Sequence, residues 1–184
     1  MNKSLGLFAF TTALIISSGS AIAQSQPGSF YTNVGATMIS DGSDSETAYF
    51  AQAGYNHYLT PFVALDLNYR HTATLDSSVA ANSTSFASKY NSYGLGLKLE
   101  QGIGWFDLYG IGGASYIDSE VSRWSVANSA VETTKESSIE PYASAGIKFA
   151  PKGSPLLLDA GVSYQWLPNN ESAASLFAGA YLTF

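Results

Sequence analysis

After residue 28, apolar and polar side chains alternate along most of the chain with a period of two residues. This period is typical of β-strands, in which successive side chains point to opposite faces. Within residues 138–150, isoleucine, alanine and phenylalanine share one face, whereas glutamate, serine, glycine and lysine share the other. The alternation predicts eight strands, at residues 29–40, 46–58, 62–74, 87–100, 105–117, 138–150, 156–167 and 173–184.

Each predicted strand is long enough to cross a bilayer, for which a tilted strand needs about 9–11 residues. After residue 23, no apolar run approaches the ~20 residues that a membrane-spanning helix needs. Charged residues make up 12% of the chain, against about 25% in soluble domains. The sequence therefore predicts an all-β fold, an eight-stranded antiparallel up-and-down transmembrane β-barrel. A soluble periplasmic barrel of the lipocalin kind is the alternative, because its strands alternate in the same way.

The predicted connections alternate between short and long. The short ones are Thr60-Pro61, Gly102-Ile103 and residues 151–155, whereas the longer, more polar ones are residues 41–45, 75–86, 118–137 and 168–172. Bacterial outer-membrane barrels have short periplasmic turns and long extracellular loops. With an even number of strands, both termini are therefore expected in the periplasm.

The two faces differ in the way that a membrane barrel requires. Small residues suit the narrow interior of an eight-stranded barrel, and the polar face carries Gly35, Gly54, Gly94, Gly96, Gly146, Gly161 and Gly179. Aromatic girdles mark the two membrane boundaries, and the apolar face carries Phe106, Phe149 and Phe184 at one rim and Tyr49, Tyr69, Tyr116, Tyr164 and Trp166 toward the other.

The first 23 residues have the features of a secretory signal peptide. Lys3 gives a positive start, residues 5–16 are mostly apolar, and Ala21-Ile22-Ala23 forms a small-x-small cleavage site. We expect residues 1–23 to be removed and residues 24–184 to form one barrel domain. The chain has no cysteine, which excludes a disulfide and a thiolate metal site.

The end of the chain completes the pattern, because Gly179, Leu182 and the terminal Phe184 follow the last predicted alternation. Together with the signal peptide, the eight amphipathic strands and the alternating turn lengths, this ending resembles the small outer-membrane β-barrels of the OmpA-type transmembrane domain and the OmpX kind. The resemblance covers essentially the whole mature chain and implies the outer membrane of a Gram-negative envelope. It also implies recognition by the barrel-assembly machinery, although Phe177 stands where the family has a polar residue. No peptidoglycan-binding domain follows, so we expect no cell-wall anchoring role.

Several charges fall on the inward face by parity, and they are Asp66, Arg70, Lys98, Glu100, Asp107, Glu140, Lys148 and Asp159. Buried charges need partners, because removal of one member of a pair typically costs about 3–5 kcal/mol. A symmetric turn at Gly102-Ile103 would place Lys98 opposite Asp107. The same count around the short turn at Gly153-Ser154 places Lys148 opposite Asp159.

We expect Asp66 and Arg70 to extend this ion-pair network toward the loop end. Two roles remain open for it. Salt bridges that switch partners would gate a narrow ion-conducting pore, as a proposed gate does in the OmpA-like family. Alternatively, the charges belong to a structural core that seals the interior, since eight strands leave just enough room for side chains to fill it.

Catalysis is the third alternative, because some small outer-membrane barrels modify lipid A. Their chemistry requires a base, usually histidine, near a serine and an orienting carboxylate. His57 and His71 both fall on the lipid-facing side and lack the spacing of the known lipid-modifying barrels. We therefore expect no enzyme, no cofactor and no metal site.

The remaining partners are predicted from charge and exposure. Without Lys3 the chain has seven basic residues against fourteen acidic ones, so nucleic acid is excluded as a partner. Outer-membrane lipid and lipopolysaccharide would surround the apolar face, and a closed barrel without edges is expected to be a monomer.

Loops 75–86 and 118–137 are the expected sites for a host or environmental surface ligand in adhesion or colonisation. Acidic side chains dominate the loop side: Asp41, Asp44, Glu46, Asp76, Asp118, Glu120, Glu132, Glu136 and Glu171, against Arg123 and Lys135. The longest loop contains Trp124 and is either an extended hairpin able to add a partner strand or a loop with one exposed ring.

Overall fold

The computed structural model describes residues 28–41, 44–75, 86–151 and 156–184. The predicted signal peptide, residues 1–23, lies outside these residues and stays a prediction. Within the described part of the chain, no helix is long and apolar enough to cross a membrane.

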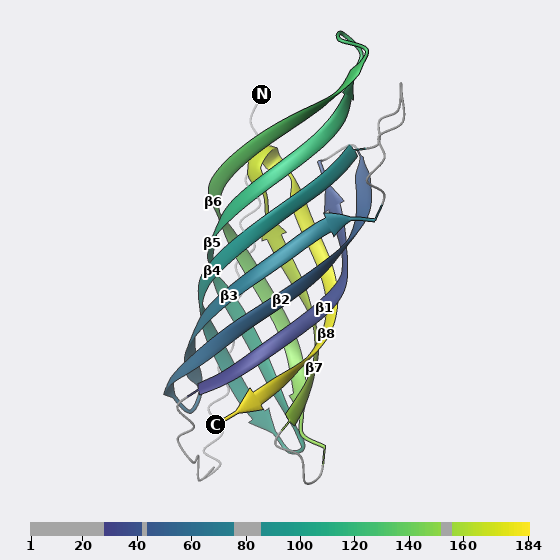
Figure 1. Ribbon diagram of the computed structural model, residues 1–184. Helices are drawn as coiled ribbons and strands as arrows, with labels where there is room; N and C mark the ends of the chain where they lie inside the picture. Colours follow the sequence, from purple (N-terminus) through teal and green to yellow (C-terminus); the bar gives the residue numbers. More distant parts are fainter. Residues whose placement is uncertain (1–27, 42–43, 76–85, 152–155) are drawn as a thin grey trace, which may run out of the picture.

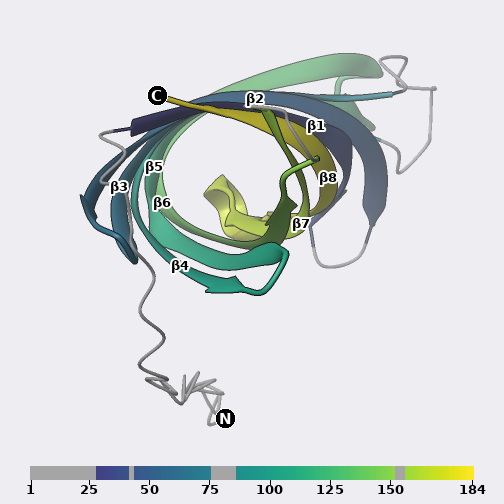
Figure 2. The same cartoon turned by 90° about the horizontal axis from the view of Figure 1, so that it is seen from below.

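Eight strands form one closed antiparallel barrel, which confirms the predicted fold class (Figures 1 and 2). They are β1 (Gly28–Ser40), β2 (Ser45–Thr60), β3 (Val63–Thr74), β4 (Phe86–Ile103), β5 (Phe106–Ser125), β6 (Ala130–Phe149), β7 (Leu156–Trp166) and β8 (Ser172–Thr183). A short 3₁₀ turn, η1 (Pro168–Asn170), joins β7 to β8. The start of β1 and the end of β8 lie at the same end of the barrel as the short turns.

The seam between β1 and β8 closes the ring and depends on a close approach of the two backbones. Their register runs from Ser29 opposite Thr183 to Ser40 opposite Ser172. At Gly179 an added Cβ would clash with the Asn33 amide on β1, so this position requires glycine.

Exposure confirms which face of each strand points outward. Large apolar side chains cover the outside, including Val34, Leu67, Leu95, Leu97, Leu108, Ile147, Val162 and Leu176. The interior holds both polar and aromatic side chains, and Asp66, Lys98, Tyr90 and Tyr181 are completely buried there. Such an outer surface suits hydrocarbon rather than water.

The turn between β4 and β5 corrects a predicted boundary. It lies at Gly104-Trp105 and not at Gly102-Ile103, because Ile103 still pairs with Phe106. Gly104 has a φ of 66°, a conformation that glycine adopts without steric cost and that two-residue hairpin turns require. The shift of two residues changes every cross-strand partner in this hairpin.

The connection predicted at residues 118–137 is mostly strand. β5 and β6 remain paired from Asp118 opposite Ser137 to Ser125 opposite Ala130, and only residues 126–129 form the turn. Figure 1 shows this hairpin rising above the other strands. The hairpin interpretation was therefore the right one of the two alternatives for this segment.

Candidate functional site

The predicted inward charges all lie on the inner side of the barrel wall. Asp66, Arg70, Lys98, Lys148 and Asp159 are buried, and the other three are partly buried: Glu100, Asp107 and Glu140. Alternation along regular strands decides which side a residue faces, and this is why parity predicted their placement. Parity does not decide which charges meet.

Glu100 is the centre of the ion pairs near the short-turn end. Its Oε2 atom lies 2.7 Å from Lys98 Nζ, and its Oε1 atom lies 2.5 Å from Lys148 Nζ. The Tyr58 hydroxyl donates to the same carboxylate at 3.2 Å. Asp107 is at the margin of this group, 4.0 Å from Lys148 Nζ and one-third exposed. One carboxylate is therefore the shared counterion of two buried lysines.

The predicted pairing of Lys98 with Asp107 is wrong. Lys98 faces Ile111 across β4 and β5, and Asp107 faces Gly102. The error follows from the position of the turn at Gly104, since a two-residue shift of the turn moves the partner by four residues.

Lys148 does lie opposite Asp159, as predicted. Its ammonium group, however, contacts Glu100 and Asp107, and the two oxygens of Asp159 instead accept hydrogen bonds from the Tyr109 hydroxyl at 3.0 Å each. A cross-strand position therefore did not determine the ion pair, because long lysine side chains reach across the lumen.

Buried tyrosines are the part of the interior that sequence reasoning missed. Lys98 Nζ lies 4.6 Å from the ring centre of Tyr181 and 4.8 Å from that of Tyr109, within the range of cation–π contacts. The Tyr31 ring stacks on Tyr181 at 4.9 Å between centres. Inward parity could have identified these rings, because tyrosines on the polar face of a narrow barrel must fill the lumen.

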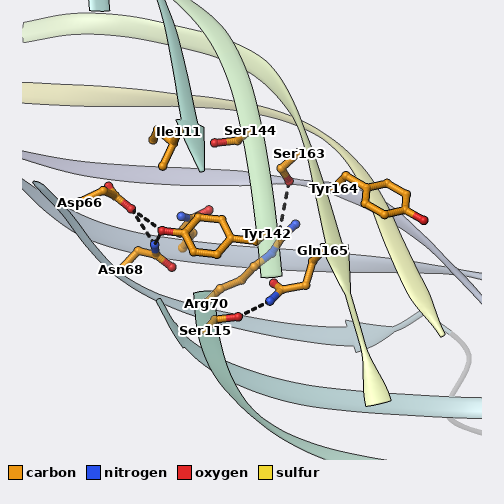
Figure 3. Close-up of a pocket in the computed structure, with 11 residues that line it drawn as sticks. Asp66, Asn68, Arg70, Ile111, Ser115, Tyr142, Ser144, Ser163, Tyr164 and Gln165 are labelled. Atoms are coloured by element: carbon orange, nitrogen blue, oxygen red, sulfur yellow. Dashed lines mark hydrogen bonds between the residues drawn. The ribbon is translucent and has the colours of Figure 1, made fainter. Parts of the chain in front are cut away.

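Asp66 is held by neutral donors in the middle of the barrel. Tyr31 donates to its Oδ1 atom at 2.7 Å. Asn68 and Tyr142 donate to Oδ2 at 2.7 and 3.1 Å, as Figure 3 shows. The prediction that Asp66 and Arg70 extend the ion-pair network is not met. Among the described residues, neither side chain forms an ion pair, and the Glu140 carboxylate forms none either.

An apolar layer lies above these polar groups, toward the loop end. Ile39, Ala48, Phe86, Tyr90, Ile117, Leu167 and Ala173 form one buried cluster there. Leu167 comes from the connection between β7 and β8, and the turn that follows it has positive φ at Asn169 and Asn170, which asparagine tolerates. Side chains thus fill the lumen. A cavity in the middle of the barrel has a volume of about 20 Å³, which is room for roughly one water molecule.

The loop end is tied together by Arg123 of β5. Its Nη1 atom lies 2.6 Å from Asp41 Oδ2, and its Nη2 atom lies 2.8 Å from Glu171 Oε1. Burial raises the pKa of the Glu171 carboxyl above its usual value, and the Arg123 guanidinium opposes this shift. Beside the two salt bridges of Arg123, a groove of about 460 Å³ is lined by Trp124, Glu132 and Glu136, among others.

Both histidines lie on the outward side of their strands, as predicted. His71 Nδ1 is 2.8 Å from Asn91 Oδ1, and His57 Nδ1 is 3.4 Å from the Tyr55 hydroxyl. In the described residues, neither imidazole forms a hydrogen bond or an ion pair with a serine or a carboxylate. No cluster of three or more His, Asp or Glu side chains within these ranges is placed to hold a metal ion.

Comparison with known proteins adds a family and a set of solved structures. Residues 9–165 match the family described as outer membrane protein beta-barrel domain. No curated protein matches the chain.

The solved structures share the fold at low sequence identity. Neisserial surface protein A matches with a TM-score of 0.69 and 15% identity, over 86% of this chain and 97% of that one. Ail, the attachment invasion locus protein of Yersinia pestis, matches with a TM-score of 0.55 and 17% identity, over 85% of this chain and 99% of Ail. For the N-terminal β-barrel domain of Pseudomonas aeruginosa OprF, the TM-score is 0.54 and the identity 17%, over 86% and 100% of the two chains.

Proposed function

Because the chain belongs to the outer membrane protein beta-barrel family, we propose that it is a non-enzymatic surface protein of the bacterial outer membrane that binds a partner at its loop end. The short turns and both chain ends would face the periplasm, and the β5–β6 hairpin would face the outside of the cell. This orientation follows the general arrangement of bacterial barrels, in which long loops are extracellular.

The β5–β6 hairpin is the observation that carries the proposal. Both strands have 20 residues, about twice the length needed to cross a bilayer. β6 pairs with β7 only from Tyr142 to Phe149. Residues 130–141 of β6 therefore present, within the described structure, a strand edge that pairs with β5 on one side alone.

A free strand edge can add an extended segment of another protein through main-chain hydrogen bonds. Pro141 stands where the pairing with β7 ends, in agreement with the tendency of proline to occupy strand edges. The unpaired backbone groups between residue 130 and Pro141 would supply affinity for the added segment. The side chains of the hairpin would supply selectivity.

Charge indicates the chemistry of the partner. The groove beside the hairpin is lined by Asp41, Glu132, Glu136 and Glu171, with Arg123 as its basic residue. Ail, which shares this fold, has been crystallised with the heparin analogue sucrose octasulfate. The acidic surface of the present chain disfavours such an anionic ligand, and we expect a partner with exposed lysine or arginine side chains.

The filled lumen supports a binding role rather than transport. Lys98, Lys148 and the stacked tyrosine rings block the short-turn half, and the apolar layer around Leu167 blocks the loop half. A pore would require both layers to move.

Attachment of cells that produce the protein tests this proposal. Deletion of residues 122–133 removes four cross-strand pairs, from Ser122 opposite Thr133 to Ser125 opposite Ala130. The combined substitution Glu132→Lys and Glu136→Lys keeps the hairpin but reverses its charge. Both changes should lower attachment to host-cell monolayers, while the unboiled protein still migrates as a folded barrel on gels.

Asp107→Asn is the matched control, because it removes one carboxylate at the opposite end of the barrel. Attachment that stays at the wild-type level in both hairpin variants, with normal assembly, would rule out the proposed role of the loop end.

A further inference from the structure

Arg70 is a buried positive charge whose contacts are all neutral. It is 4% exposed, and its Nη1 and Nη2 atoms donate to the hydroxyl groups of Ser163 and Ser175 at 3.2 and 2.6 Å. Its guanidinium carbon lies 3.7 Å from the centre of the Phe50 ring. Within the described part of the chain, no carboxylate lies within ion-pair distance of Arg70.

This arrangement differs from that of the other buried cations. Lys98 and Lys148 share the Glu100 carboxylate. The carboxylate on the same strand, Asp66, precedes Arg70 by four residues, or about 13 Å along the strand. Its oxygens already accept three hydrogen bonds from neutral donors. A guanidinium group cannot lose its charge in a protein, so an anion beside it would offset the cost of burying that charge.

Further polar groups without partners surround Arg70. Its own Nε atom, the hydroxyl group of Ser92 and that of Tyr90 are buried, and none has a hydrogen-bond partner among the described residues. Ser92 is the cross-strand neighbour of Arg70, and Tyr90 is the next inward residue along β4. These three groups can all donate hydrogen bonds.

The cavity of about 20 Å³ lies against the same arginine (Figure 3). Serine hydroxyls and glutamine amides line it next to Arg70, with Ser115, Ser163 and Gln165 among them, and Asp66 borders it as well. Its volume admits a particle of about the size of one water molecule and excludes sulfate, phosphate and carboxylic acids.

From the buried guanidinium, the unpartnered donors and the size of the cavity, we propose that the lumen binds one halide ion, chloride in physiological media, against Arg70. Hydrogen bonds from N–H and O–H groups satisfy a halide completely, whereas a water molecule would leave the charge uncompensated. The ion would be the counterion of Arg70, in the same way that Glu100 is the counterion of the two lysines. It would thereby stabilise the barrel at a charge that has no carboxylate within ion-pair distance among the described residues.

Refolding of the full-length mature barrel from urea into detergent tests the site. Sodium chloride, sodium bromide and sodium gluconate are compared at equal ionic strength, so that general screening is the same in each. Chloride and bromide should raise the folded fraction. Above the dissociation constant, each tenfold increase in halide should raise the folding equilibrium constant about tenfold. Crystals grown in bromide should show an anomalous peak within hydrogen-bond distance of Arg70.

Two variants and a control make the result specific. Arg70→Met should abolish the difference between chloride and gluconate. If this variant fails to fold, Ser163→Ala provides the second test, because it removes a hydroxyl group that lines the cavity and should weaken the halide response. Arg123→Met removes an arginine that already contacts Asp41 and Glu171, and it should keep the wild-type halide response. Equal stability of the wild type in chloride and gluconate, or no bromide peak at Arg70, would show that water or a distant carboxylate serves this arginine.

Discussion

The Nζ atom of Lys148 lies 2.5 Å from Oε1 of Glu100, although these residues belong to β6 and β4 and a complete strand separates them. This ion pair therefore crosses the lumen, whereas the pair between Lys98 and the same carboxylate lies along one strand. Glu100 is the acid that two buried lysines share. The interior is consequently sensitive to that single carboxylate.

Replacement of Glu100 by glutamine should strongly destabilise the barrel. The substitution keeps the size of the side chain but leaves Lys98 and Lys148 without their shared counterion. Loss of one partner from a buried ion pair typically costs about 3–5 kcal/mol. Urea titration in detergent, with the folded fraction read on unboiled gels, measures the change.

Asp107→Asn serves as the comparison for that experiment, since Asp107 is 34% exposed and lies 4.0 Å from Lys148. It should cost less than about 1 kcal/mol, as is usual for solvated pairs. A larger loss for Asp107→Asn than for Glu100→Gln would show that Asp107, and not Glu100, is the main counterion of the buried lysines.

Gly179→Ala should impair closure of the ring. The added methyl group would clash with the Asn33 side-chain amide and the Thr32 carbonyl oxygen across the β1–β8 seam, which closes the barrel. We expect a smaller heat-modifiable fraction after refolding. Gly112→Ala is the matched control, because its added Cβ would meet no atom within 4 Å. Equal refolding yields for the two variants would contradict the tight seam.

A spin label at Val162 should be accessible to oxygen dissolved in lipid and protected from an aqueous relaxation agent. Val162 lies on the outward face of β7, whereas Lys135 lies on the hairpin beyond the expected membrane boundary. A label at Lys135 should show the reverse accessibility. The chain has no cysteine, so single introduced cysteines give unique labels. Aqueous accessibility at both positions would exclude a lipid-facing exterior.

The pH dependence of stability should reveal the buried carboxyl of Glu171. The pKa of this carboxyl in the folded state is raised above its usual value of 4.5. Its contribution to the free energy of unfolding is therefore fully present below pH 4.5 and is lost as the pH rises through the raised pKa. The stability of Glu171→Gln minus that of the wild type should therefore be larger at neutral pH than at about pH 4. Urea midpoints of both proteins across this range measure the difference. A difference that does not change with pH would argue against the raised pKa.

Purified wild-type protein in planar bilayers should show no discrete conductance steps, because side chains fill both halves of the lumen. Regular steps that disappear in Glu100→Gln would instead support a pore controlled by the lumenal ion pairs. This recording separates transport from binding at the loop end.

The alternation of apolar and polar side chains by itself determined the fold class, the number of strands and the direction of each inward charge. A regular strand turns successive side chains to opposite faces, so the face of Arg70 or Asp159 is a local property that parity specifies. The position of the β4–β5 turn was less well determined. Apolar residues extend through Ile103, and the two-residue turn depends on the positive φ of Gly104.

Only the tertiary structure decided which side chains meet inside the barrel. Lys148 contacts Glu100, two strands away, while Asp159 on the neighbouring strand is held by Tyr109. Long side chains cross a narrow lumen, so their partners depend on strand stagger and barrel closure, which involve residues far apart in the chain. For the same reason, only the arrangement of all eight strands showed that, within the described residues, no carboxylate lies within ion-pair distance of Arg70.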